Sequence, residues 1–261
     1  MRNFTLHSYQ KLLEVLQQSG YQFLTVTDYF QHHYDFNQPF VILRHDVDKR
    51  PQQCVHFAQI EHAMGIRSTF YFRVIKGKVY EKELKAVLQA QHEVGYHYED
   101  LYVAKGDSQQ ATVTFSKNLA ILRQFYPVQT IVMHGTPHSK IDNKTMWQNV
   151  DYRAFGITSE PYLDIDFSTV FYLTDTGGCW DGYKYSVRDK IAQFQPLWEQ
   201  QGLIYHSTQD IILALQNGTF PSRVLLTTHP QRWLNNPILW AKERIVQHLK
   251  NYIKQALILF R

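Results

Sequence analysis

The stretch 41-VILRHDVDKRPQQ-53 places an arginine, a histidine and two carboxylates within five residues, where an apolar segment ends. In an extended backbone, residues two apart face the same way, so Asp46 and Asp48 are expected to point together, about 6 to 7 Å apart at the backbone. Two carboxylates that close cannot both stay ionised cheaply without a cation beside them. The spacing therefore predicts that one carboxylate binds a divalent metal while the other acts as a base. The simpler interpretation is that Asp48 caps the next helix and Asp46 pairs with Arg44.

Two later segments offer ligands for such a metal. The segment 92-HEVGYHYED-100 contains His97 and Glu99, which can supply a nitrogen and an oxygen ligand from the same side of the backbone. The segment 131-IVMHGTPHS-139 presents His134 just before a glycine that allows a sharp turn. A hydrogen-bonded structural histidine is the alternative for His97.

Two further segments suit proton transfer and sugar binding. In 172-YLTDTGGCWDG-182, Asp175 precedes a glycine pair, and the face of Trp180 suits stacking on a sugar, although a core tryptophan is an equal alternative. In 225-LLTTHPQRW-233, His229 is suited to proton transfer near neutral pH. Arg232 follows it and is a second candidate for contacts with substrate.

Strand and helix patterns alternate about seven times along the chain, and the polar residues fall where strands end. Strands are predicted at 22–26, 40–44, 66–74, 96–99, 128–134, 169–175, 202–206 and 223–229. Helices are predicted over the first twenty residues, at 51–65, at 81–94 with Gly95 as the stop, after the caps Asp107 and Ser207, and from about 236 to Phe260. The alternation predicts a parallel sheet covered by helices, as a barrel or an open doubly wound sheet. In both, the carboxyl ends of the strands surround one cleft.

Composition narrows the function classes. The chain has 261 residues, 44% hydrophobic and 19% charged, without a linker, which predicts one domain over 1–261. Lysines and arginines are scattered, so a net charge of +4 favours an anionic ligand mildly and nucleic acid poorly. The amphipathic first twenty residues do not read as a signal peptide, and no apolar run of about 18 residues predicts an integral membrane segment. With only Cys54 and Cys179, which are expected to be packed thiols, we expect a cytoplasmic protein.

The ordered motifs RHDVD, HEVGYHYE, MHGTP, DTGGCW and THPQRW resemble those of polysaccharide deacetylases with the NodB-type fold, carbohydrate esterase family 4 in the broad sense. The resemblance covers about residues 40 to 235 and is to a divergent branch, with D-x-D in place of the usual T-F-D-D-G. It implies an α/β fold of the distorted (β/α)7-type barrel kind. We expect an N-terminal helical extension at 1–38, a catalytic core at 39–235 and a C-terminal helix at 236–261. The family further implies a divalent metal, most often zinc, and hydrolysis of an N-acetyl group on a sugar.

The resemblance assigns the proton-transfer roles position by position. Asp46 matches the catalytic base, and His229 matches the histidine that acts as acid. Arg44 or Asp175 is expected to orient these two groups. The family's usual arginine motif before the tryptophan segment has no clear match in this chain.

The metal ligands are assigned only in part. Asp48 matches the metal-binding aspartate and His97 the first metal histidine. The family's second metal histidine stands four residues after the first, where this chain has Leu101. Glu99 and His134 are therefore both candidates for the third ligand.

The predicted substrate is an N-acetylated sugar, either soluble or linked to a lipid carrier, used in making surface polysaccharide or lipopolysaccharide. One alternative is a metal-dependent glycosyltransferase with a D-x-D motif, which gives no reason for histidines at three later strand ends. A second is an inactive deacetylase-like domain that binds carbohydrate or a partner; retention of Asp46 and His229 speaks against it. In the terminal helix, packing on the core is expected over contact with a second subunit for Trp240, Ile245, Tyr252, Ile253, Leu257 and Leu259.

Overall fold

One sheet of parallel strands organises the structure, a computed structural model that describes residues 2–136, 139–186 and 188–259, with side chains through Ile253. Within these residues there are seven strands: β1 (Gln22–Leu24), β2 (Phe40–Val47), β3 (Thr69–Phe72), β4 (Glu93–Tyr98), β5 (Ile131–Met133), β6 (Phe171–Thr174) and β7 (Arg223–Thr228). Their order is β5-β4-β3-β2-β7-β6, with β1 paired to the start of β2. All strand pairings are parallel.

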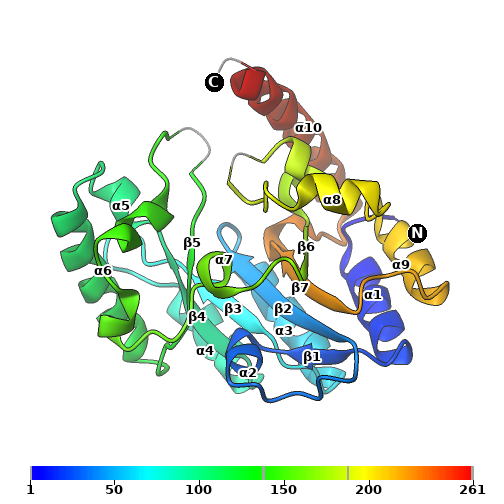
Figure 1. The fold of residues 1–261 in the computed structure, drawn as a ribbon, viewed down its shortest axis with the longest axis horizontal. Helices are drawn as coiled ribbons and strands as arrows, with labels where there is room; N and C mark the ends of the chain where they lie inside the picture. The colour runs from blue at the N-terminus through cyan, green and yellow to red at the C-terminus, as the bar shows by residue number, and fades with distance from the viewer. Residues whose placement is uncertain (1, 137–138, 187, 260–261) are drawn as a thin grey trace.

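Helices flank the sheet, which curls into an open half-barrel (Figure 1). The α-helices are α1 (Leu6–Gln18), α2 (Val26–Phe30), α3 (Gln52–Ala63), α4 (Glu81–Gln89), α5 (Asp100–Val103), α6 (Ser108–Arg123), α7 (Pro161–Asp164), α8 (Gln195–Gln200), α9 (Thr208–Gln216) and α10 (Pro237–Leu259). In Figure 1, α5 and α6 lie on the β4–β5 side and α1 and α9 on the β7 side. The expected α/β fold with a distorted barrel is confirmed.

Local signals in the sequence account for the helix starts. The side chain of Asp107 accepts hydrogen bonds from the backbone N–H groups at positions 109 and 110, and thereby caps α6. Ser207 and Asp210 form the predicted capping box at the start of α9. These side chains satisfy backbone N–H groups that have no partner inside a helix.

The central strand β2 is buried on both faces, and polar side chains on each face bond to neighbouring elements or to each other. On the face away from the strand-end cavity, His45 Nε2 lies 2.9 Å from Glu61 Oε1 of α3, and His45 Nδ1 lies 2.7 Å from Thr228 Oγ1 of β7. Tyr9 of α1 donates its hydroxyl hydrogen bond to the same Glu61 at 2.6 Å. Because side chains alternate along a strand, Arg44 and Asp46 point the other way.

One predicted helix ends earlier than expected, and one predicted strand is absent from the described residues. The helix expected at 81–94 ends at Gln89, and β4 begins at Glu93. Gly95 lies inside β4 instead of stopping a helix; a Cβ there would come within 2.2 Å of the Tyr71 ring, so the close packing of β3 on β4 requires glycine. The strand expected at 202–206 is absent from the described residues, because this segment continues the turn after α8, where Leu203 N bonds to Trp198 O.

The terminal helix is present as α10, but the expectation that it packs on the core is wrong for three of its residues. Ile245, Tyr252 and Ile253 are 63%, 70% and 58% exposed, and do not pack on the core. Trp240 is half-buried, whereas the side chains of Leu257 and Leu259, and the whole of Phe260, lie outside the described residues. No helix in the described part of the chain has the length and apolar character needed to cross a lipid bilayer.

Candidate active site

The carboxyl ends of the strands surround a cavity of about 500 Å³. Its lining includes residues that follow or end β2, β4, β5 and β7, as the sequence pattern predicted. Among them are Asp46, Asp48, His97, His134, His229 and Arg232. The parallel arrangement of the strands brings residues that are far apart in the sequence to one edge of the sheet.

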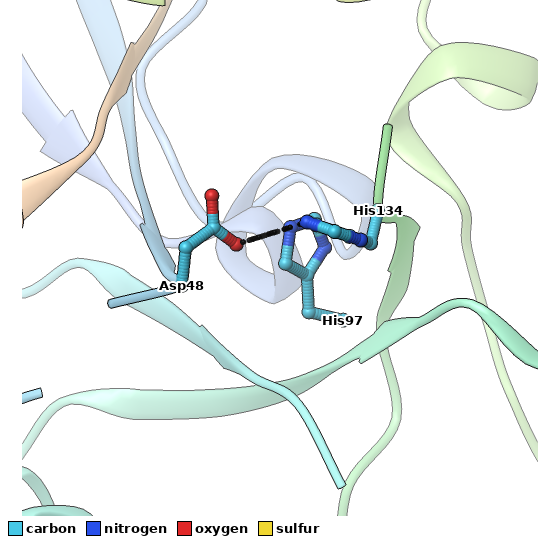
Figure 2. Close-up of side chains that lie close together, drawn as sticks. All are labelled: Asp48, His97 and His134. Atoms are coloured by element: carbon cyan, nitrogen blue, oxygen red, sulfur yellow. Dashed lines mark ion pairs between the residues drawn. The ribbon is translucent and has the colours of Figure 1, made fainter. Parts of the chain in front are cut away.

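Asp48, His97 and His134 form a compact group in this cavity (Figure 2). Asp48 Oδ1 lies 3.4 Å from His97 Nε2 and 3.5 Å from His134 Nε2. The three potential ligand atoms all lie within 4.8 Å of one another. Each residue comes from a different strand end, so the group exists only in the folded protein.

Hydrogen bonds at the far side of each imidazole assign its protons. His97 Nδ1 lies 3.1 Å from the carbonyl oxygen of Val132, which can only accept, so Nδ1 carries the hydrogen. His134 Nδ1 lies 2.9 Å from Glu99 Oε2, and the same assignment follows for the ionised carboxylate. In the neutral rings both Nε2 lone pairs therefore face Asp48 Oδ1, a buried oxygen with no hydrogen-bond partner among the described residues.

This donor set fits a divalent metal. Ligands about 2.0 to 2.2 Å from a tetrahedral zinc ion stand about 3.3 to 3.6 Å from each other, which matches the Asp48–histidine separations. Two nitrogens and one oxygen, with the rest of the coordination open to the cavity, are typical of catalytic rather than structural zinc sites. Asp48, His97 and His134 are the residues that would hold such an ion.

Glu99, the other candidate for the third ligand, lies behind His134. Its second oxygen is 2.5 Å from Arg73 Nη2, so both carboxylate oxygens are occupied by protein groups. Burial alone would raise the pKa of Glu99, but the hydrogen bond and charge of His134, together with Arg73, lower that pKa to about 2. The geometry favours His134 as the ligand and Glu99 as the residue that orients it. Leu101, the fourth residue after His97, is buried.

Asp46 is held beside this group by a buried ion pair. Arg44 donates from Nε and Nη2 to the two carboxylate oxygens at 2.9 and 2.7 Å. Burial opposes ionisation of Asp46, but the charges of Arg44 and His97 bring its pKa below the usual value. Asp46 Oδ2 also lies 3.7 Å from His97 Nε2. Asp46 is therefore an ionised carboxylate oriented toward the Asp48, His97 and His134 group.

The simpler interpretation of the D-x-D motif is correct only for the Arg44–Asp46 pair. Asp48 does not cap α3, because the N-cap of that helix is Pro51 and, in the described part of the chain, no side chain accepts its first N–H groups. The Asp48 side chain instead points toward His97 and His134 (Figure 2) and lines the cavity.

His229 faces the same group from the opposite wall. Its Nδ1 lies 2.7 Å from Asp175 Oδ1, and its Nε2 lies 4.0 Å from Asp48 Oδ2. Burial and the charge of Arg232 lower the pKa of His229, but the Asp175 carboxylate outweighs them and raises it above the usual value. Trp233 Nε1 donates to the other oxygen of Asp175 at 2.7 Å and fixes that carboxylate. His229 is therefore an oriented imidazole that can hold a proton at Nε2.

The structure places the two candidates for sugar contact differently. Trp180 is 3% exposed, packs against Phe4 and Trp233, and donates from Nε1 to Thr208 Oγ1 at 3.1 Å. The expectation that its ring stacks on a sugar is wrong, because core packing encloses the ring and it does not line the cavity. Arg232 lines the cavity and donates to the carbonyl oxygen of Asp175 at 2.5 Å.

Asp189 is a cavity residue that the sequence did not reveal. It accepts hydrogen bonds from the hydroxyls of Tyr162 at 2.6 Å, Thr174 at 3.1 Å, Tyr172 and Thr176. Burial raises its pKa, but the charges of His229 and Arg44 and these hydrogen bonds lower it to about 2. Asp189 follows no strand and belongs to no motif, so no local signal marks it.

No family model matches the chain, and no curated protein matches it by sequence. Solved structures do. A family 4 carbohydrate esterase from Streptomyces lividans in complex with acetate is 12% identical, with a TM-score of 0.42 over 83% of this chain and 90% of that one. A peptidoglycan deacetylase from Bacillus subtilis is 13% identical, with a TM-score of 0.40 over 84% and 99%. A family 4 pseudoenzyme from Bacillus anthracis is 12% identical, with a TM-score of 0.40 over 84% and 63%.

Proposed function

We propose that this chain is a metal-dependent hydrolase that removes an N-acetyl group from a sugar. The observation that carries the proposal is the convergence of two imidazole lone pairs on the unsatisfied Oδ1 of Asp48, next to an oriented carboxylate and an oriented imidazole. A cation between Asp48 Oδ1 and the two Nε2 atoms would offset the repulsion among these three hydrogen-bond acceptors. A divalent cation there would polarise an acyl carbonyl and lower the pKa of a bound water.

Asp46 and His229 can each carry out one of the two proton transfers that amide hydrolysis requires. Asp46, held ionised by Arg44, can take the proton of an attacking water. His229, whose proton Asp175 stabilises, can donate it to the departing amine, which is a poor leaving group without that proton. Water attack and amine departure then release acetate and leave a free amino sugar.

The substrate we propose is an N-acetylated sugar intermediate in surface polysaccharide or lipopolysaccharide synthesis. Exposed Lys49 and Lys250 line the cavity, and a phosphate or diphosphate group on the sugar would complement their charge. The glycosyltransferase alternative gives no role to His97 and His134, whose Nε2 atoms lie 3.4 and 3.5 Å from Asp48 Oδ1. It also gives no role to His229, which Asp175 orients.

Metal content of the purified protein tests the site first. We expect near-stoichiometric zinc or another divalent metal in the wild type, and its loss in His97→Ala and His134→Ala. His206→Ala is the matched control, because His206 also contacts a carboxylate, that of Asp181 at 3.1 Å, but is outside the cavity. A wild-type protein that holds no metal and fails to take up zinc, cobalt or nickel would contradict the proposal.

Acetate release tests the reaction. We expect the metal-loaded protein to release acetate from N-acetylated sugar nucleotides or lipid-linked sugars. His229→Gln is expected to retain the metal and to lose activity by about a hundredfold or more. Metal-loaded protein that binds these sugars without releasing acetate would identify the inactive binding domain instead. Release of a nucleoside diphosphate would identify a glycosyltransferase.

A further inference from the structure

The helix α10 has its polar residues turned toward the protein and its apolar residues turned outward. On the inward face, Gln247 and Asn251 are buried, and Asn251 Nδ2 donates to the carbonyl oxygen of Gly177 at 2.8 Å. Arg244 donates to the carbonyl oxygen of Gly178. The outward face carries side chains that are 60% to 77% exposed: Ile238, Ile245, Leu249 and Tyr252. This is the reverse of the pattern expected for a helix that packs on a core.

The outward residues form one continuous stripe. Ile238, Ile245, Leu249 and Tyr252 are separated by seven, four and three positions, which places them on one side of a helix. Exposed apolar surface that is contiguous is a feature of protein and membrane interaction sites. In Figure 1, α10 projects past the ends of the strands. The exposed fractions of its outward side chains show that this side is open.

The charges along this stripe are positive. Lys242 stands within the stripe and Lys250 beside it, and both are exposed. The acidic residue of the helix, Glu243, is paired with Arg50 at 2.9 Å. An occupant of the outward face therefore meets apolar side chains and lysines together.

We propose that the outward face of α10 docks on a lipid surface that carries anionic headgroups. Isoleucine, leucine and tyrosine side chains can enter the boundary between headgroups and acyl chains, while lysines extend to the phosphates. A second copy of the chain fits less well, because two such faces would bring lysines together without a carboxylate to offset them.

The helix α10 also borders the cavity, so docking on lipid would place the mouth of the cavity near the lipid surface. Gln247, Lys250 and Ile253 of α10 line the cavity, so the helix that meets the lipid is also one wall of its mouth. The docking inference itself does not depend on the reaction proposed above.

Sedimentation with vesicles tests the inference on the full chain. We expect binding to vesicles of phosphatidylcholine mixed with phosphatidylglycerol in equal parts, and much weaker binding to phosphatidylcholine alone. The double variant Ile245→Gln with Leu249→Gln should bind about tenfold or more weakly. Lys242→Gln should weaken binding to the anionic vesicles about fivefold and leave binding to phosphatidylcholine vesicles unchanged.

A matched control separates this face from general loss of surface apolar residues. Val113 of α6 and Leu213 of α9 are 49% and 47% exposed, and their double substitution by glutamine should leave binding unchanged. Equal binding of the α10 variant and the wild type, or no binding of the wild type to anionic vesicles, would overturn the inference. So would a dimer in analytical ultracentrifugation that dissociates in the α10 variant. Metal content is measured in parallel, so failure of the active site is recognised separately.

Discussion

Replacement of Glu99 tests whether this carboxylate binds the metal or orients the histidine that does. Glu99 accepts from His134 Nδ1 at 2.9 Å and from Arg73 Nη2 at 2.5 Å. Glutamine keeps the size of the side chain and one acceptor oxygen but removes the charge. We expect Glu99→Gln to weaken zinc binding about tenfold, and His134→Ala to weaken it by about a hundredfold or more, because the latter removes a ligand.

The tenfold figure follows from the electrostatics of Glu99. Burial opposes its ionisation, yet its pKa falls from an ordinary 4.5 to about 2, through His134 first and then Arg73. That difference corresponds to about 3 kcal/mol in favour of the ionised form. His134 and Arg73 together account for this free energy, and solvent screens part of it because the Glu99 side chain is 13% exposed. About 1 to 1.5 kcal/mol remains for the His134 contact, which is about tenfold in affinity.

Competition with a chromophoric zinc chelator at constant pH measures the affinities. Asp181→Asn is the matched control, because that carboxylate also contacts a histidine, His206, outside the cavity. Unchanged affinity in Glu99→Gln would refute the orienting role. A loss as large as that of His134→Ala would refute the ligand assignment and make Glu99 a ligand itself.

Three other substitutions test separate parts of the structure. Asp175→Asn removes the carboxylate that raises the pKa of His229, so the basic limb of the rate profile, where the proton donor is lost, should move to lower pH; an unmoved limb contradicts the role of His229 as acid. Burial raises the pKa of Asp100 from 3.8 to about 6, so its stabilising contribution is full below about pH 4 and is lost as pH rises through about 6. In Asp100→Asn the free energy of unfolding, measured with urea, should no longer fall over this pH range; the fall in the wild type is at most about 3 kcal/mol. If the free energy of unfolding depends on pH in the same way in both proteins, the shifted pKa of Asp100 is contradicted. Trp180→Phe should lower stability by about 1 to 3 kcal/mol, through lost packing and the lost hydrogen bond to Thr208, and leave KM unchanged; a raised KM would restore the sugar-stacking role.

The elements that position the site could be predicted because their signals are local. An apolar run before Arg44 marks β2, and the caps Asp107 and Ser207 mark the starts of two helices. Residues at strand ends were expected to meet because parallel strands end at the same edge. That reasoning needs only to know which segments are strands and which are helices, and not which strands are paired.

The parts that could not be predicted depend on which elements are neighbours. The choice between Glu99 and His134 depends on the pairing of β4 with β5, in which His97 stands opposite Val132. Asp189 reaches the cavity from a segment without regular structure, so only tertiary packing places it. The segment 202–206 is rich in β-forming residues but follows α8 as a turn, because tertiary context overrides weak strand propensity.

The two polar faces of β2 have a consequence for protein engineering. Arg44, Asp46 and Asp48 build the cavity side, while His45 ties the reverse side to Glu61. A slip of the strand by one position would exchange the two sets of side chains. A graft of the three cavity residues onto another scaffold would therefore need the reverse-side anchor as well, and a mutational scan confined to the cavity wall would overlook the contacts on the reverse side of the strand.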